Sequence, residues 1–268
     1  MYSDHLVLTT FNEMLNTTQI GKAAAPNEVW DEIDSTNSRA LLLANQGVPH
    51  GVVVAARMQS AGRGRQGRVW ISPPDAGLYI SFLLRPEVAL TQLPLISLAT
   101  GCAVARAVQS TCGLGVGLKW VNDVIADGRK LGGILAEMSG TKALVIGIGL
   151  NVRAVERPPE LASRAVAIEE LVSEPVNVNL LAANLASEME ESYSSLCRGE
   201  RTLITEEWKA KSVTLGKTVR AMLGATKQAE GVAIDLARDG ALVVRTIDGD
   251  IELHAGEITI RNADGSYA

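Results

Sequence analysis

The sequence predicts a mixed α/β domain over residues 1–212 and a small all-β barrel over residues 213–268. Two observations support this division. Apolar runs typical of strands alternate with helical patterns as far as residue 211. From residue 215 onward the chain changes to short β-rich runs separated by glycine turns. A segment rich in glycine and arginine, residues 59–70, lies between two early strands and needs a separate explanation.

The first half of the chain alternates strand and helix signals. Residues 38–47 predict a helix, because capping side chains precede it and Gly47 ends it. Residues 91–111 predict a long helix that stops before Gly113. The pair Asp127 and Gly128 is a strong hairpin signal. The strands expected here span residues 51–57, 78–84, 115–120, 122–126, 129–138 and 143–151.

The second half predicts a loop, two helices and the barrel. Residues 156–167 contain Pro158 and Pro159 and indicate an exposed loop. Leucine and methionine recur at helical spacing in the predicted helix 178–197, and a second helix is expected over 201–211. The barrel holds about fifty residues, near the lower limit for a domain, so we expect it to pack against the larger one. Its strands are expected over residues 219–223, 228–236, 241–246, 250–253 and 257–260.

Composition narrows the class of protein. The apolar fraction of 47% and charged fraction of 21% are ordinary for a globular protein, and the net charge of −5 argues against a general nucleic-acid binder. Cys102, Cys112 and Cys197 form no CxxC pair, so neither a disulfide frame nor a metal site is expected. No secretory signal or membrane-length apolar run is present. We therefore expect a soluble cytoplasmic protein.

The loop over residues 59–70 is the most distinctive stretch. Three arginines stand among three glycines in residues 62–68, and guanidinium groups so close in sequence favour an anionic ligand between them. The spacing also matches GxGxxG, but that motif needs a helix after its last glycine, and residues 68–74 are β-rich and broken by proline. A solvated flexible loop is the alternative. Gln59 and Trp70 at its ends favour a loop that folds over a ligand.

Four further clusters could carry chemistry. Lys119, Asn122 and Asp123 crowd a strand junction, where they are either a solvated ion pair or nucleotide ligands. Lys130 precedes two glycines within a strand, which often mark close approach of a ligand. Alternating glycines in residues 147–151 permit either such an approach or tight packing. Residues 35–37 either cap a helix or bind a neutral polar group such as a urea.

These motifs together resemble those of biotin protein ligases. They occur in that family's order at residues 34–37, 59–70, 119–123, 129–134 and 147–151, and residues 256–258 resemble the end of the family's C-terminal barrel. The resemblance implies a class II aminoacyl-tRNA-synthetase-like α/β catalytic domain, as in biotin and lipoate ligases, with a small C-terminal SH3-like β-barrel. It implies ATP-dependent activation of biotin to biotinoyl-5'-AMP, with Mg²⁺, and transfer of biotin to a lysine of a biotin carboxyl carrier protein.

The resemblance also implies roles for individual residues, with Lys130 and Arg65 in catalysis. The residues expected to bind biotin are Ser35, Thr36, Asn37, Gln59, Arg63, Gly64, Arg65, Lys130 and Gly133. Those expected to bind ATP or the adenylate are Arg63, Arg65, Arg68, Trp70, Lys119, Asn122, Asp123, Lys130 and Asn151.

Two residues depart from the family pattern, and two alternatives stay open. Val121 stands where proline is usual, and Gln66 where arginine is frequent. Only 33 residues precede Asp34, fewer than the roughly 50 of an independent domain, so we expect a monofunctional enzyme that binds neither DNA nor membrane, as a monomer or weak homodimer. The alternatives are a lipoate-ligase-like adenylate-forming transferase and a non-catalytic module that binds a ligand or nucleic acid.

Overall fold

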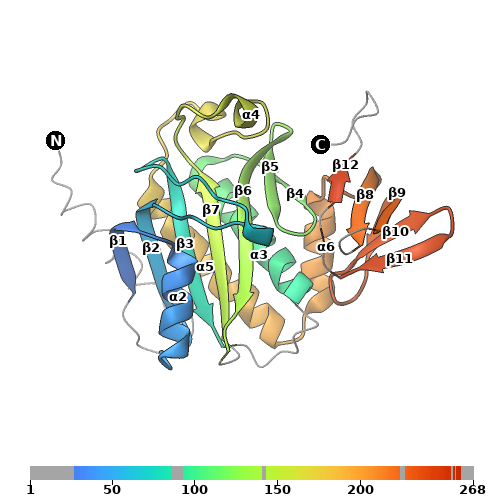
Figure 1. Ribbon diagram of the computed structural model, residues 1–268, viewed down its shortest axis with the longest axis horizontal. Coiled ribbons are helices and arrows are strands. Elements are labelled where there is room, and N and C mark those ends of the chain that lie inside the picture. The colour runs from blue at the N-terminus through green and yellow to red at the C-terminus, as the bar shows by residue number, and fades with distance from the viewer. Residues whose placement is uncertain are drawn as a thin grey trace.

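The computed structural model describes residues 27–85, 93–140, 143–223, 227–254, 256 and 258–260. Within these residues a seven-stranded sheet forms one unit and a five-stranded sheet forms a second (Figure 1). The first sheet has the order β1 (Glu28–Ile33), β2 (Val52–Gln59), β3 (Gly77–Leu84), β7 (Leu144–Asn151), β6 (Arg129–Met138), β5 (Asp123–Ala126), β4 (Gly117–Lys119).

Helices cover both faces of the large sheet, but unequally. Helices α3 (Leu93–Cys112), α5 (Val178–Cys197) and α6 (Arg201–Lys211) lie behind it in Figure 1, and α2 (Thr36–Asn45) lies in front. Strand β1 runs parallel to β2, whereas every other neighbouring pair in the sheet is antiparallel. All eight residues of β3 are buried, as expected for a central strand covered on both faces.

Local sequence explains where α2 begins and ends. The Ser35 hydroxyl accepts a hydrogen bond from the Ser38 amide at 3.4 Å, and Gly47 takes a positive φ of 82° after the last turn. Ala40, Leu43 and Ala44 pack against the front of β2, β3 and β7. This packing holds the N-terminal end of α2 against the middle of the sheet.

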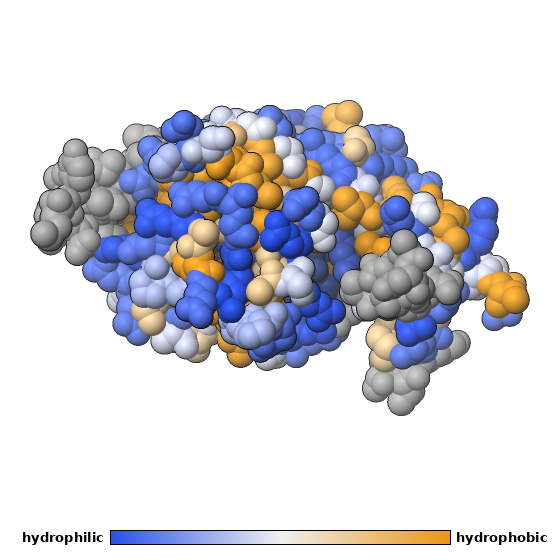
Figure 2. Space-filling view, turned by 90° about the horizontal axis from the view of Figure 1, so that it is seen from above, coloured by the Kyte–Doolittle hydropathy of each residue, from blue (hydrophilic) through white to orange (hydrophobic). Residues whose placement is uncertain are grey.

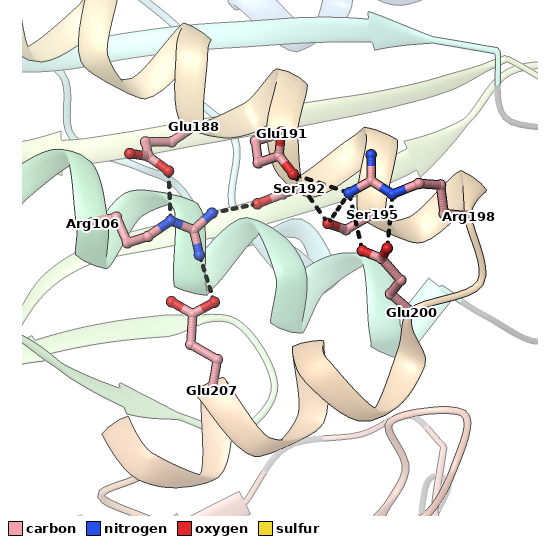
Figure 3. A network of polar contacts seen from close by, with 8 residues as sticks. All are labelled: Arg106, Glu188, Glu191, Ser192, Ser195, Arg198, Glu200 and Glu207. Carbon is pink, nitrogen blue, oxygen red and sulfur yellow. Dashed lines mark hydrogen bonds and ion pairs between the residues drawn. The ribbon is translucent and has the colours of Figure 1, made fainter.

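The rear helices are joined by a polar cluster centred on Arg106 of α3 (Figure 3). The Arg106 guanidinium donates to Glu188 at 2.5 Å, to Glu207 at 2.5 Å and to Ser192 at 2.8 Å. Because Glu188 and Ser192 belong to α5 and Glu207 to α6, this one side chain ties three helices together. Cys102 lies one turn away on α3, and burial raises the pKa of its thiol to about 12.

The second unit packs on the β4 edge of the large sheet. Its strands have the order β11 (Gly249–Leu253), β10 (Leu242–Thr246), β9 (Lys227–Leu236), β8 (Thr218–Leu223), β12 (Ile258–Ile260), and all pair antiparallel. The Trp120 indole donates to the Gly240 carbonyl at 3.1 Å, and the Trp120 amide donates to the Thr214 hydroxyl at 2.9 Å. Buried Trp120 therefore anchors the small unit to the large one.

The expected fold class is confirmed, and two local expectations are corrected. Strand β1 was not expected, since residues 28–33 lack a clear alternation and only their pairing with β2 makes them a strand. Residues 156–167 are not simply an exposed loop: they include α4 (Pro159–Ala162), and Val166 and Ala167 are fully buried. Residues 91, 92 and 257 of the predicted elements lie outside the described residues. Among the helices described, none has the length and apolarity needed to cross a bilayer.

Candidate active site

Gly133 of β6 and Gly147 and Gly149 of β7 leave a strip without side chains on the front face of the large sheet, and this strip with the side chains that lie over it is called the groove below. Gly149 of β7 pairs with Gly133 of β6 on one side and with Tyr79 of β3 on the other. A Cβ atom at Gly149 would lie 2.5 Å from Trp70 Nε1, and one at Gly133 would lie 3.5 Å from a carbon of the same ring. The Trp70 indole thus occupies space that exists only because these two positions lack side chains.

One end of this groove is lined by neutral polar groups. A Cβ atom at Gly147 would lie 2.0 Å from Asn37 Oδ1, so this glycine makes room for the Asn37 amide. The Ser81 hydroxyl lies 2.6 Å from Asn37 Oδ1 and 2.8 Å from Thr36 Oγ1. Gln59 Oε1 accepts from the Thr36 amide at 2.9 Å and from its hydroxyl at 3.1 Å. Thr36, Asn37 and Ser81 are all buried, so these hydrogen bonds fix the pocket wall.

The other end of the groove is cationic. Lys130 Nζ pairs with Asp123 Oδ1 at 2.6 Å and lies 5.8 Å from the centre of the Trp70 ring. The same ammonium is 3.6 Å from the position that a Cβ atom would take at Gly133. A fixed positive charge therefore lies beside the glycine floor and under Trp70.

The loop over residues 59–70 passes in front of the large sheet (Figure 1), where its Trp70 side chain lies against Gly133 and Gly149. Bridges join Gln59 to Ser72 and Arg63 to Val69, and a short 3₁₀ turn, Arg65–Gly67, forms its tip. Gln66 and Gly67 have φ values of 55° and 74° at this turn. The described element that follows Gly67 is β3 and not a helix, so the structure as well as the sequence excludes the dinucleotide interpretation.

The tip of the loop reaches the second unit. Arg65 donates to the Asn122 side-chain oxygen at 3.0 Å and to the Gly256 carbonyl at 3.1 Å. Asn122 in turn donates to the Ile134 carbonyl at 2.9 Å, next to the glycine floor. Arg65 therefore connects the loop, the strand junction before β5 and the C-terminal unit.

The segment that follows the loop is anchored by a charged pair and a phenol. Two parallel hydrogen bonds of 2.7 Å from Arg57 to Asp75 hold the pKa of that carboxyl below its usual range. Burial raises the pKa of Tyr79, so its neutral hydroxyl donates to the Pro73 carbonyl at 3.2 Å. Both contacts fix the C-terminal end of the loop relative to β2 and β3.

A further segment, residues 153–168, lies at the top of Figure 1 and is hydrogen-bonded to β6 and β7. Lys130 exchanges backbone hydrogen bonds with it, from its amide to the Arg164 carbonyl at 2.8 Å and from the Val166 amide at 3.0 Å. Asn151 donates to the Val166 carbonyl at 3.1 Å. Seen from above, apolar residues gather near the middle of this end and polar ones surround them (Figure 2).

Each of the two units matches a known protein family. Residues 29–151 match the Biotin/lipoate A/B protein ligase family, and residues 214–261 match the Biotin protein ligase C terminal domain. The biotin--[acetyl-CoA-carboxylase] ligase of Paracoccus denitrificans is 33% identical over 243 residues, which are 84% of this chain and 96% of that protein. The chain belongs to the biotin protein ligase family.

Solved ligases share the whole architecture. The Aquifex aeolicus biotin protein ligase in complex with biotin and ATP superposes with a TM-score of 0.79 at 29% identity, covering 88% of this chain and 99% of that one. The Leishmania major ligase in complex with biotinyl-5-AMP gives 0.62 at 27% identity, covering 85% and 98%. The biotin interpretation is thereby favoured over a lipoate ligase, because the second unit matches a domain named for biotin ligases.

In this biotin protein ligase, most of the residues predicted for the site come together around one groove. Thr36, Asn37 and Gln59 lie at the neutral end, and Lys130, Asp123 and Trp70 at the cationic end. Ser35 caps α2, and Lys119 lies opposite Asp123 in the backbone register of β4 and β5. Arg68 is exposed and follows the tip of the loop. The Trp120–Val121 peptide bond, at the position where the family usually has proline, is cis.

Two of the residues predicted to bind a ligand are bonded to other groups of the protein in this structure. Asn37 Nδ2 donates to Glu137 Oε2 at 2.9 Å and to the Leu135 carbonyl at 3.3 Å, so its amide protons are in use. The Arg63 guanidinium pairs with Glu137 Oε1 at the neutral end of the groove, away from Lys130. Their predicted contacts with ligand stay predictions.

Three residues of the groove were missed by sequence reasoning: Ser72, Ser81 and Glu137. Ser72 accepts from Gln59 Nε2 at 2.8 Å and donates to the Trp70 carbonyl at 3.1 Å. Ser81 is a lone hydroxyl within an apolar strand, and Glu137 is a lone carboxylate near the end of β6. A single hydroxyl and a single carboxylate within otherwise apolar strands were the sequence features that could have indicated these residues, since a buried strand rarely holds an unpaired polar group.

Proposed function

We propose that this ligase activates biotin with ATP to biotinoyl-5'-AMP and then transfers biotin to a lysine of a biotin carboxyl carrier protein. The observation that carries the proposal is a single glycine-floored groove with a neutral polar end and a cationic end. Biotin has the same polarity, a neutral ureido ring at one end and a carboxylate at the other. ATP would enter beside the carboxylate, next to Trp70 and Lys130.

In the first step, a carboxylate oxygen of biotin attacks the α-phosphorus of ATP, and pyrophosphate leaves. Two anions must meet, so fixed positive charge is needed where negative charge accumulates. Lys130 supplies it by exchanging its partner Asp123 for the substrate oxygens, and Arg65 supplies it from the loop tip. Trp70 Nε1 is buried and lacks a partner among the described residues, which supports a ligand contact for it.

In the second step, the neutral amine of the carrier lysine attacks the acyl carbon of biotinoyl-AMP, AMP leaves with the bonding electron pair, and the new amide nitrogen releases one proton to solvent. The mixed anhydride must be shielded from water until then. The loop over residues 59–70 and segment 153–168 cover the groove from two sides, which supports a lid role for both.

Magnesium belongs to this proposal as the counter-ion of the ATP phosphates. Within the described residues no group of three or more His, Cys, Asp and Glu could hold a metal ion. Mg²⁺ does not require such a group, because it keeps several waters and binds through one or two carboxylates plus substrate phosphates. Asp123 would be its carboxylate, and the ion would neutralise phosphate charge.

Further parts of the proposal concern partners and organisation. We propose a domain boundary at residues 212/213, supported by the end of α6 at Lys211 and the start of the C-terminal family match at residue 214. The net charge of −5 supports the absence of DNA among the partners. A cytoplasmic location and a monomer or weak homodimer complete the proposal; free cysteines support the former.

The test is biotin-dependent exchange of labelled pyrophosphate into ATP, followed by transfer of labelled biotin to a carrier domain. We expect exchange with biotin and none with lipoate, and label on one lysine of the carrier. Exchange with lipoate alone would make the chain a lipoate ligase. No exchange with either acid, despite binding of biotin, would make it a non-catalytic binding protein.

A further inference from the structure

Glu137 holds two partners from different parts of the site. It lies near the end of β6, where its side chain is 21% exposed. Its Oε2 atom accepts from Asn37 at the start of α2, and its Oε1 atom pairs with Arg63 on the loop. The second terminal nitrogen of Arg63 lies 3.4 Å from the Ser38 hydroxyl, also on α2. One carboxylate therefore links the sheet, the helix that carries Thr36, and the loop.

The Glu137 side chain completes a continuous chain of hydrogen bonds that runs from Trp70, at one end of the loop, to Arg63, near the other. The chain passes through the neutral end of the groove, and it includes three of the residues expected to bind biotin, Thr36, Asn37 and Gln59. Its members, in order, are Trp70, Ser72, Gln59, Thr36, Ser81, Asn37, Glu137 and Arg63. Ordering the middle of such a chain restrains both ends.

Arg63 is far from the charge that would meet the biotin carboxylate. Lys130 Nζ lies beside Gly133, and Glu137 is four residues further along the same strand, about 13 Å at ~3.3 Å per residue. An Arg63 side chain paired with Glu137 therefore serves the ring end of the groove. This placement separates it from Arg65, which lies at the loop tip next to Asn122.

We propose that Glu137 is a positioning residue that couples filling of the neutral pocket to closure of the loop over residues 59–70. The inference rests on the proposed function, because the ligand that fills the pocket is biotin. Substrate bonded to Thr36 and Gln59 fixes Asn37 through Ser81, and Asn37 fixes the carboxylate that receives Arg63. Arg63 then holds the loop down at the ring end, and Lys130 and Arg65 are left to the reacting groups.

A role in which Glu137 competes with the substrate for Arg63 predicts a change in biotin affinity of the opposite sign. If Glu137 merely occupied Arg63 in place of the substrate carboxylate, its removal would free Arg63 and tighten binding of biotin. If it couples pocket and loop, its removal weakens binding and leaves the loop open. The sign of the change in affinity separates the two.

The main test is Glu137→Gln, which keeps an oxygen acceptor for Asn37 and removes the charge that pairs with Arg63. We expect the Kd for biotin, measured by calorimetry, to rise about tenfold, as for loss of a partly exposed charge-assisted hydrogen bond. We also expect biotin to protect the loop from protease in the wild-type enzyme and to give no protection in the variant. Glu230→Gln is the matched control, since Glu230 pairs with Arg220 on the C-terminal sheet.

A double-mutant cycle makes the test independent of any folding defect in β6. Arg63→Ala breaks the same pair from the loop side, where the side chain is 42% exposed. The double variant Arg63→Ala/Glu137→Gln should bind biotin no more weakly than either single variant, because both remove one interaction. Unchanged or tighter binding of biotin by Glu137→Gln or Arg63→Ala, or additive effects in the cycle, would overturn the inference. Wild-type enzyme that neither binds biotin nor exchanges pyrophosphate would instead overturn the proposed function, and the inference with it.

Discussion

Two arginine-centred regions of this ligase, one behind the large sheet and one in front, use the same kind of ion pair for different purposes. Behind the sheet, Arg106 bonds Glu188, Glu207 and Ser192, all on helices packed tightly together (Figure 3). In front, Arg63 and Lys130 pair with carboxylates beside glycines whose missing side chains leave a groove. The front pairs lie beside strand glycines that carry no side chain, whereas the rear cluster lies among helix side chains.

An ion pair by itself therefore does not distinguish a ligand-binding region from a structural one. Side-chain exposure does not separate the two regions, since Arg106 is 30% exposed and Lys130 38%. What separates them is the surrounding backbone: three helices fix Arg106, whereas a loop and a glycine floor surround Lys130. Substitutions on the front should therefore change activity, and substitutions on the rear should change stability.

The largest effect is expected from Lys130→Ala. Loss of the fixed charge at the cationic end should slow biotin-dependent pyrophosphate exchange by about a hundredfold or more, as for other removed charge-stabilising groups. Lys209→Ala is the control, because Lys209 also pairs with a carboxylate, Asp235, but lies on α6. Near-normal exchange by Lys130→Ala at saturating substrates would remove Lys130 from the chemistry.

Gly149→Ala should come next. The new methyl group would lie 2.5 Å from Trp70 Nε1, so the indole must leave the floor and the groove is partly filled. We expect kcat/KM for pyrophosphate exchange to fall at least about tenfold, as small displacements in a site commonly do. Gly140→Ala adds the same methyl group where no atom lies within 4 Å and should leave the rate unchanged. Equal rates for Gly149→Ala and Gly140→Ala would show that the site tolerates a side chain at position 149.

Arg106→Met should change stability and leave catalysis intact. It leaves Glu188 and Glu207 without their shared cation, and we expect a loss of about 1–2 kcal/mol in the free energy of unfolding. Denaturant unfolding measures it, and pyrophosphate exchange at 25 °C should match the wild type. Arg198→Ala, which removes an exposed pair on the same face, should leave the denaturation midpoint unchanged. A loss of exchange in folded Arg106→Met would contradict the division between the two regions.

The smallest effect concerns His50, away from both regions. Burial, and then the nearby Arg85 charge, lower its pKa below the usual 6.5, and its Nδ1 atom accepts from the Arg85 amide at 3.1 Å. The unfolded chain therefore binds a proton at His50 more readily than the folded protein does. Neutral His50 contributes to stability above pH 6.5, and this contribution is lost as the pH falls through the folded-state pKa of His50. His50→Asn keeps an acceptor but does not titrate. Thermal midpoints between pH 7.5 and about 5 should fall less for His50→Asn than for the wild type; parallel curves would remove His50 from the pH dependence.

Local chemistry made much of the site predictable. Paired glycines, a lysine before them and a glycine-arginine loop are unusual within a short stretch, and each has a physical reason readable from its own neighbours. Capping residues fixed the start of α2, and the turn at Asp127 and Gly128 fixed the hairpin between β5 and β6. Strand β1 could not be read in this way, because its side chains carry no strong alternation.

The sequence by itself determined the order of the elements, the two-unit organisation and the chemistry of the loop, since these depend on residues near one another in the chain. Only the tertiary structure decided which polar groups meet. Asn37 and Glu137 are 100 positions apart, and Arg63 and Glu137 are 74 apart. A lone glutamate in a strand has many potential partners, and the packing of α2 and the loop on the glycine face selects two of them. That selection places the Arg63 guanidinium beside Glu137.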